Sequence, residues 1–337
     1  MKSVLVTGAP GWLGNTLLKK IQPMGLRIHL IVDPVFTGVE INKLLPAISD
    51  DQMRVTYCDL RDKEKLSSAI SGCDTVLHMA AVQHPRTIKE LYSINAEASA
   101  ALAELAAKSA VEKFIFVSSC SVQGPSANAT NELMPLTGCT HYTMSKIAAE
   151  SKLQKIKEQF GMHLVIIRPG VFYGTDASVN MNKLMDMIRQ KPVPVFGPNG
   201  FKRTYVQIEK VAEALVLAAE RGRSGDAYLI GDLEPLTTRE FYETIAEGLG
   251  CKARIVSLPT VVSRLAEATT FAIGSGLNRH FRMGNIIGEF GRPTFFSSVK
   301  STDLGFQQLP SSRVGLKEMA TTYRSALEKN NDQLYRH

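Results

Sequence analysis

Two side chains that can exchange protons stand four residues apart in the segment His141-Tyr142-Thr143-Met144-Ser145-Lys146. Residues at positions i and i+4 lie on one face of a helix, so Tyr142 and Lys146 would project side by side. A free phenol loses its proton near pH ~10, and a neighbouring cation favours the phenolate and lowers that pKa. The pair therefore indicates proton transfer at neutral pH, although the spacing alone is common and its weight depends on the surrounding elements.

A glycine-rich turn opens the chain. The run Lys2–Gly8 is short, apolar and rich in β-branched residues, which predicts a buried strand. A helical pattern begins near Asn15, and the turn between strand and helix contains Gly8, Gly11, Trp12, Leu13 and Gly14. Glycine lets the backbone turn tightly and lets phosphate oxygens approach, while the helix N-terminus offers free N–H groups. These residues are candidates for binding the pyrophosphate of a dinucleotide.

An acidic residue follows at the distance expected for such a site. The run from 27 to 32 predicts a second strand, and it ends at Asp33, which stands 19 residues after Gly14. An acid in this place can bind the ribose hydroxyls of adenosine. Strand, glycine turn, helix and acid together predict a dinucleotide-binding site.

Composition limits the classes of function. The chain has 337 residues, 44% of them hydrophobic and 21% charged, which is ordinary for a globular protein. The net charge of +7 contains no basic run longer than pairs such as Lys19-Lys20, so we expect no nucleic-acid partner. No apolar run reaches the ~18 residues of a membrane span, and no histidine–carboxylate cluster has the spacing of metal ligands.

The cysteines and the N-terminus predict a cytoplasmic protein. Five cysteines occur without Cys-x-x-Cys spacing, an odd number that indicates reduced thiols. The N-terminus is itself the expected first strand, so we predict no signal peptide.

Strand-like and helix-like patterns alternate through the first half of the chain. Further strands are predicted at 53–59, 75–78, 113–119 and 163–168, and helices at 63–71, 94–109 and 142–160. This alternation predicts an α/β fold with a doubly wound, parallel Rossmann sheet that binds ligands at the carboxyl ends of its strands.

The second half predicts a smaller lobe. We expect residues 1–175 to form the dinucleotide-binding domain, with 205–232 returning to it. Residues 176–204 and 233–312 would form a mostly helical substrate-binding lobe, and 313–337 a C-terminal helix and tail. An apolar stripe in this lobe comprises Val261, Val262, Leu265, Phe271 and Ile273. We expect the stripe to pack in the core, with a lid over an apolar substrate as the alternative.

The chain resembles the extended short-chain dehydrogenase/reductase family, also called the NAD-dependent epimerase/dehydratase family, over nearly its whole length. The resemblance rests on the order and spacing of several motifs, each of them weak alone. They are Thr7-Gly8-x-x-Gly11-x-x-Gly14, Asp59-Leu60, His78-x-Ala80-Ala81, Asn95, Ser118-Ser119, Tyr142-x-x-x-Lys146, Arg168-Pro169-x-x-x-Tyr173-Gly174 and Arg203-Thr204-Tyr205-Val206.

The resemblance implies a catalytic set. Ser119 would hydrogen-bond the reacting oxygen of the substrate, although a shift by one place to Ser118 stays open. Tyr142 would exchange a proton with that oxygen, and Lys146 would hold the nicotinamide ribose and lower the pKa of Tyr142. The reaction implied is hydride transfer between nicotinamide C4 and the carbon of a secondary alcohol or ketone, without a metal.

The resemblance also implies the cofactor contacts. Asp59 and Leu60 would lie beside the adenine, and Ala80 and Ala81 would line the cofactor cleft. We expect NAD in preference to NADP, because Asp33 would repel a 2′-phosphate and the residues that follow it, Pro34-Val35-Phe36, carry no cation.

Several other polar residues receive structural predictions. We expect His78 and Asn95 to be structural and His141 to lie in a loop. Cys120 and Cys139 are expected to be small buried residues.

The substrate class is left between alternatives. Val171 stands where the family's nucleotide-sugar enzymes commonly have asparagine, which favours a dehydrogenase or reductase. Arg203 stands where those enzymes bind a diphosphate, so a nucleotide-sugar 4-epimerase or dehydratase with tightly bound NAD is the first alternative; a salt bridge is the other interpretation of Arg203. A non-catalytic NAD(P)-sensing protein is the second alternative. The family further implies a small-molecule substrate and a homodimer formed through residues 96–107 and 142–160.

Overall fold

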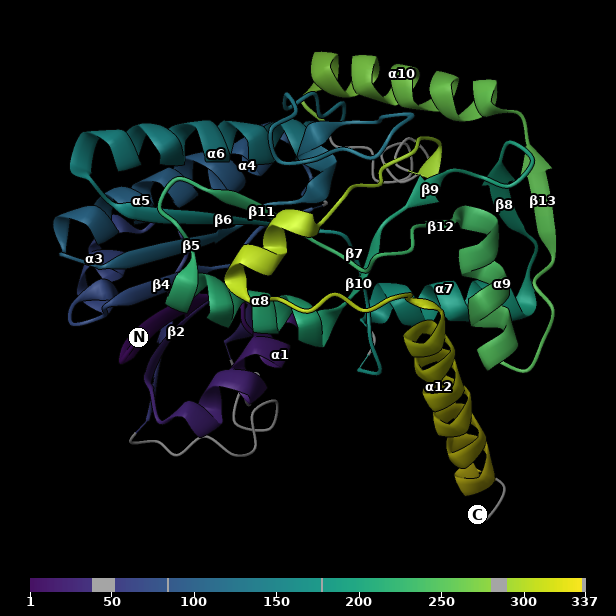
Figure 1. The fold of residues 1–337 in the computed structure, drawn as a ribbon, viewed down its shortest axis with the longest axis horizontal. Helices are drawn as coiled ribbons and strands as arrows, with labels where there is room; N and C mark the ends of the chain where they lie inside the picture. Colours follow the sequence, from purple (N-terminus) through teal and green to yellow (C-terminus); the bar gives the residue numbers. More distant parts are fainter. Residues whose placement is uncertain (38–51, 84, 177, 280–289, 335–337) are drawn as a thin grey trace.

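A seven-stranded parallel sheet lies at the centre of the protein (Figure 1), which we describe from a computed structural model for residues 1–37, 52–83, 85–176, 178–279 and 290–334. Its strand order is β11-β6-β5-β4-β1-β2-β3. The bounds are β1 (Ser3–Thr7), β2 (Arg27–Val32), β3 (Met53–Tyr57), β4 (Thr75–His78), β5 (Lys113–Val117), β6 (His163–Pro169) and β11 (Ala227–Ile230). The chain begins inside the sheet and builds outward to both edges, so a crevice is expected beside the carboxyl end of β1. The prediction of a doubly wound Rossmann sheet is confirmed.

Helices cover both faces of this sheet (Figure 1). One face carries α1 (Trp12–Ile21) and α8 (Ile208–Arg221), and the other carries α3 (Lys63–Ile70), α5 (Ser99–Lys108) and α6 (His141–Phe160). The helix α4 (Ile88–Tyr92) leads through a π-helical turn, Ser93–Ala98, into α5. Apolar side chains fill both layers; one core includes Leu30 and Leu215, and the other includes Phe114 and Leu102. The central strands are buried on both faces, which explains their continuous apolar sequences.

A second group of elements forms its own apolar core. It contains α7 (Val179–Gln190), α9 (Thr238–Gly248) and α12 (Arg313–Leu334), together with the strand pairs β7 (Val171–Tyr173) with β10 (Tyr205–Gln207), β8 (Val193–Phe196) with β13 (Ile255–Leu258), and β9 (Lys202–Arg203) with β12 (Leu236–Thr237). Sequence reasoning missed β13, because four residues with two exposed side chains give too short a pattern, and only pairing with β8 makes them a strand. The domain boundaries given above stay a prediction.

The helix α10 (Thr260–Leu277) lies at the margin of the molecule (Figure 1) and corrects one expectation. Its stripe does not pack in the core, since Val261, Leu265 and Ile273 are 55%, 62% and 46% exposed. The buried side of α10 consists instead of Ser263, Glu267 and Gly274. Helical spacing predicted the stripe correctly but could not say which side faces the protein. Among the described residues, none of the helices is long and apolar enough to cross a membrane.

Candidate active site

The glycine turn between β1 and α1 is folded too tightly for any side chain. Gly8 has φ +95°, and a Cβ atom there would lie 2.8 Å from the Ala80 nitrogen. A Cβ on Gly11 or Gly14 would lie 2.7 or 2.6 Å from the Gly8 carbonyl oxygen. The N-terminus of α1 has no side-chain cap and no acid in its first turn, so its N–H groups face outward. This cradle fits the pyrophosphate of a dinucleotide.

The two residues inside this turn have different positions. Leu13 is buried in the core, so it could contact a cofactor only through its backbone. Trp12 begins α1 half-buried, and its ring meets Phe172 edge-to-face at 6.4 Å. The cradle is thereby anchored on one face of the sheet.

The carboxyl ends of β2 and β3 carry the acids predicted for the adenosine end. Asp33 is exposed, and its carboxylate accepts a hydrogen bond of 2.9 Å from the Val35 nitrogen. Asp59 binds Arg61 with both carboxylate oxygens, and the hydrogen bond from Arg61 is the main cause that lowers the pKa of Asp59. Leu60 is half-buried between them. Sequence reasoning overlooked the cation Arg61. The hydrogen bond with Asp59 is the main cause that raises the pKa of Arg61, and the charge of Asp33 makes a smaller contribution, so Arg61 lies within electrostatic reach of Asp33.

A buried network fixes the carboxyl end of β4. His78 is fully buried, with its ring nitrogens 2.7 Å from the hydroxyls of Thr7 and Ser99. Burial lowers the pKa of His78 to about 3, and the Lys146 charge adds to this, so the ring stays neutral. The Ala80 nitrogen donates to the Thr7 hydroxyl at 3.2 Å, which places Ala80 and the following Ala81 beside the glycine turn. The structural role expected for His78 is confirmed.

Asn95 ties the loop after β4 to α6. Its amide group exchanges two hydrogen bonds of 2.8 Å with the backbone of Val82 and donates at 3.0 Å to the Ser145 hydroxyl. Asn95 and Ser145 are fully buried and Val82 is partly exposed, and this bonding agrees with the structural part expected for Asn95.

The start of α6 sets the positions of Tyr142 and Lys146. Thr140 caps the helix in a reciprocal arrangement with Thr143, which fixes the first turn at His141. His141 is therefore helical and buried, and the expectation of a loop residue was wrong. Tyr142 is half-buried in the first turn, and Lys146 follows one turn later.

Lys146 places its ammonium group deep inside the protein. Only 1% of the residue is exposed, and Nζ donates at 2.6 Å to the Val117 carbonyl at the end of β5. Nζ also lies 4.2 Å from the centre of the Phe116 ring. Burial lowers the pKa of Lys146 to about 7, and the nearby charge of Glu150 opposes that shift. A lysine this deep, at the sheet edge where ligands bind, is typical of a functional site.

The two serines after β5 differ in their contacts. The Ser119 hydroxyl caps a short 3₁₀ turn, Cys120–Gln123, and lies 2.7 Å from the Ser121 hydroxyl. The Ser118 hydroxyl is buried without a hydrogen-bond partner among the described residues. Which of them contacts a substrate stays a prediction, with Ser119 the more accessible.

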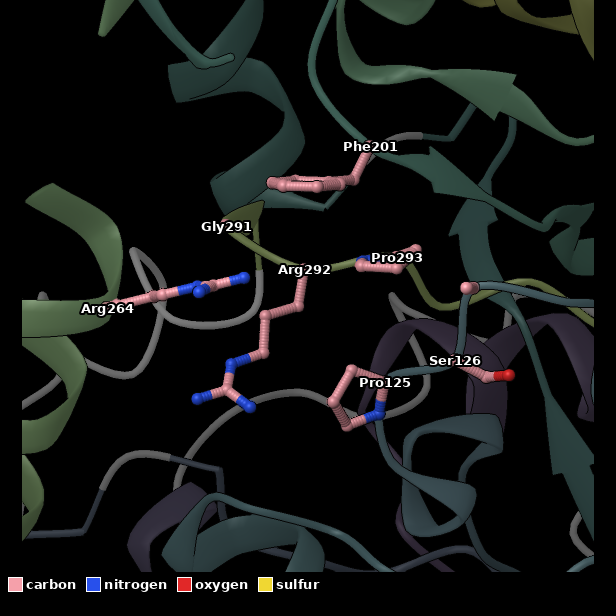
Figure 2. Close-up of a pocket in the computed structure, with 8 residues that line it drawn as sticks. Pro125, Ser126, Phe201, Arg264, Gly291, Arg292 and Pro293 are labelled. Carbon is pink, nitrogen blue, oxygen red and sulfur yellow. The ribbon is translucent and has the colours of Figure 1, made fainter. Parts of the chain in front are cut away.

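Two cavities lie near the residues predicted to be catalytic. The larger, of about 380 Å³, is lined by residues that include Pro125, Phe201, Arg264 and Arg292 (Figure 2). The smaller is lined by Ser121, Gly124, Pro125, Cys139, Thr140, Thr143, Arg203, Arg292 and Thr294. Neither is lined by Ser119 or Tyr142; the cavity wall is formed by their neighbours, Ser121 on one side and Thr140 and Thr143 on the other. Arg203 therefore shares a cavity with the sequence neighbours of Ser119 and Tyr142, whereas Tyr142 itself lines neither cavity.

Arg203 has a partly apolar environment. It is buried on β9, and its guanidinium lies 4.9 Å from the centre of the Phe290 ring. Sequence reasoning missed the residues that share its cavity, Cys139 and Arg292, and the partner of Arg292, Glu267. No sequence signal marked them, because they come from separate segments that meet only in the fold. Cys120 is buried as expected, whereas Cys139 is partly exposed to the cavity.

Comparisons with known proteins agree with this geometry. The model of the NAD dependent epimerase/dehydratase family matches residues 4–231. A ketoreductase of Stigmatella aurantiaca that acts on a farnesyl dihydroquinoline oxide is 26% identical over 77% of each chain. A UDP-glucose 4-epimerase of Vibrio cholerae is 27% identical over 74% of this chain and 76% of its own. A 3 beta-hydroxysteroid dehydrogenase/isomerase of Mycobacterium tuberculosis is 24% identical over 98% and 92%.

Solved structures show the same fold. The UDP-glucose 4-epimerase of Thermus thermophilus in complex with NAD superposes with a TM-score of 0.74 at 23% identity, over 96% of this chain and 99% of its own. The predictions of an enzyme and of NAD as cofactor are confirmed at the level of the family. The protein belongs to the NAD-dependent epimerase/dehydratase family of extended short-chain dehydrogenases/reductases.

Proposed function

We propose that this protein is a dehydrogenase or reductase that acts on a secondary alcohol or ketone with NAD. The observation that carries the proposal is the position of Lys146, buried one helical turn after Tyr142 at the sheet edge that holds the glycine cradle. Burying a lysine is unfavourable unless its charge has a use or a partner. NAD supplies the hydride acceptor when it is bound.

The residues of the chain then have distinct roles. Ser119 holds the substrate oxygen by a hydrogen bond, and Tyr142 accepts the proton of the substrate hydroxyl as the carbon is oxidised. To accept this proton, Tyr142 must first be a phenolate, and the charge of Lys146 stabilises that form. In the reverse direction Tyr142 donates a proton to the oxygen of the ketone.

The cofactor would be held along the carboxyl edge of the sheet. Its pyrophosphate fits the cradle of Gly8, Gly11 and Gly14, with Trp12 and Leu13 in the same turn. At the adenosine end, Asp33 would bind the ribose, and Asp59 and Leu60 would lie beside the adenine. Ala80 and Ala81 would line the cofactor cleft, a proposal supported by the hydrogen bond that holds Ala80 beside the glycine turn.

The residue at position 171 favours a dehydrogenase over a nucleotide-sugar epimerase. Val171 packs against the core of the second group of elements and has no polar atom in its side chain to offer a sugar diphosphate. The relatives include a ketoreductase and hydroxysteroid dehydrogenases, which act on ketones or alcohols. An epimerase is the second candidate, because Arg203 and Arg292 line one cavity and the relatives also include an epimerase.

One assay separates the two candidates. Purified protein is incubated with NAD and a panel of secondary alcohols, UDP-sugars and dTDP-sugars, and absorbance is followed at 340 nm. Net NADH with an alcohol supports the dehydrogenase. A changed sugar epimer detected by NMR without net NADH supports the epimerase. NAD binding without either product supports a non-catalytic, NAD-sensing protein.

Two further parts of the proposal concern the setting of the enzyme. We place it in the cytoplasm, supported by five free cysteines. We propose a homodimer through α5 and α6, supported by the small residues of these helices and by exposed Met144 and Phe160 on α6. Light scattering at micromolar concentration tests this, and a monomer would remove the dimer from the proposal.

A further inference from the structure

Three arginines surround the two cavities beside the catalytic set. Arg292 lines both cavities, Arg264 lines the larger and Arg203 the smaller. Figure 2 shows Arg264 and Arg292 pointing into the same space beneath the ring of Phe201. Arginine binds phosphate strongly and often through two hydrogen bonds, so such a group of cations would ordinarily predict a phosphate-bearing substrate.

The position of Glu267 argues against a phosphate-bearing substrate. Glu267 lies on the buried side of α10 and is 6% exposed. Its Oε2 atom is 2.6 Å from Nη2 of Arg292. Both oxygens are shielded from water, and by strict geometry neither is hydrogen-bonded within the described residues, but the Cys139 thiol lies close enough to interact with the carboxylate. The ion pair therefore joins a buried carboxylate to an arginine whose side chain is 35% exposed, and the guanidinium supplies the main compensation for the carboxylate.

Glu267 also affects the pKa of Cys139 in the wall of the smaller cavity. Burial, followed by the neighbouring charge of Glu267, raises the pKa of Cys139 to about 11, so the thiol keeps its proton at neutral pH. Cys139 lines the smaller cavity with Arg292. The wall formed by these residues thus carries a neutral thiol and an already paired guanidinium.

The other two arginines are less suited to replace Arg292. Arg203 is buried, with its guanidinium against the ring of Phe290. Arg264 is exposed, so solvent and salt screen its charge. A phosphate in this space would have to compete with Glu267 for Arg292 and would itself be repelled by the carboxylate.

We propose that Glu267 is a positioning residue that selects substrates by their charge: its buried carboxylate holds Arg292 in an ion pair, excludes phosphate-bearing molecules from the cavity and leaves the cavity to uncharged substrates. The inference rests on the proposed function and narrows its substrate class. Glu267 acts through Arg292 and touches no reacting atom.

Isothermal titration with UDP tests this inference, with uridine as the uncharged probe. Wild type is expected to bind UDP weakly, and Glu267→Gln to bind it at least tenfold more tightly, because Arg292 is released while the side chain keeps its shape. Uridine binding should be the same in both proteins. Glu267→Asp, which keeps the charge, should resemble wild type, and so should Glu243→Gln, which breaks an exposed Glu–Arg pair on α9.

Equal UDP affinity in wild type and Glu267→Gln would overturn the inference, since a merely structural acid would destabilise the protein without a gain in anion binding. If Glu267→Gln does not fold, Arg292→Gln decides the matter: UDP affinity unchanged from wild type supports the inference, and a large loss overturns it. NAD binding and NADH formation are measured separately on wild type. Their absence would count against the proposed function and leave the UDP comparison intact.

Discussion

Phe271 of α10 stacks on His141 of α6, with ring centres 4.3 Å apart and planes inclined by only 4°. The Ser275 hydroxyl, one turn further along α10, lies 3.2 Å from Nε2 of the same histidine. These contacts join α10 to the residue that precedes Tyr142. The helix thus covers the region beside the catalytic set while most of its apolar stripe faces solvent.

Removal of this stack should loosen α10. An aromatic pair contributes about 1 kcal/mol beyond buried area, so Phe271→Ala is expected to speed amide hydrogen exchange in α10 several-fold. Leu265→Ala, at an exposed position on the same helix, is the control and should change little. Unchanged exchange in Phe271→Ala would show that the stack does not hold the helix.

Lys146 should make stability depend on pH. The folded pKa of Lys146 is about 7, below the ~10.4 of an unfolded lysine, so the unfolded chain binds the extra proton between these values. The unfavourable contribution of Lys146 is therefore complete below pH 7 and disappears as pH rises towards 10.

Lys146→Met removes that contribution. The free energy of unfolding of wild type minus that of the variant should increase between pH 7 and pH 10, by up to about 4 kcal/mol. Urea unfolding at several pH values measures this difference. Lys152→Met, at an exposed lysine of the same helix, should show no such trend, and a flat difference for Lys146→Met would contradict the prediction.

A buried ion pair joins α6 to β6. Arg168 of β6 binds Glu150 through two hydrogen bonds, of 3.0 and 2.6 Å, and both side chains are buried. Glu150→Gln would leave the Arg168 charge uncompensated, so we expect a loss of about 3–5 kcal/mol in unfolding free energy. Glu104→Gln breaks an exposed pair with Lys108 and should lose less than about 1 kcal/mol. Similar losses for both variants would argue against a stabilising role of the Arg168 pair.

Asp33 should determine the choice between NAD and NADP. We propose above that Asp33 binds the adenosine ribose, where its carboxylate would repel a 2′-phosphate, and the Arg61 guanidinium lies within electrostatic reach of Asp33. In Asp33→Ser the repulsion is lost and Arg61 can attract the phosphate, so the ratio of NADP to NAD affinity should rise at least tenfold. Titrations with both cofactors measure the ratio. Asp176→Ser, at an exposed acid, serves as the control, and an unchanged ratio in Asp33→Ser would locate the selectivity elsewhere.

Much of the fold could be predicted because its determinants are local. Buried parallel strands such as β1 and β5 have continuous apolar sequences, and the glycines of the first turn leave no room for side chains. The relation of Tyr142 to Lys146 follows from helix geometry alone, and the structure places both in α6.

The rest depends on contacts between distant segments. Glu267 and Arg292 lie on either side of residues 280–289, which are outside the described residues. No sequence pattern near Glu267 or Arg292 predicts their ion pair. The orientation of α10 is set by Glu267 and Phe271, which contact other parts of the fold, and not by its apolar stripe. The identity of the substrate belongs to this second group, since its cavity is assembled from several separate segments.

The most direct test of hydride transfer is NADH formation by wild type and Tyr142→Phe, measured at 340 nm with the alcohol that the panel identifies. Tyr142→Phe should bind NAD with unchanged affinity and lose at least a hundredfold in turnover, because only the proton acceptor is removed. Tyr92→Phe, at another half-buried tyrosine, should stay active. Near-normal turnover by Tyr142→Phe would contradict the assignment of Tyr142 as the acid–base group.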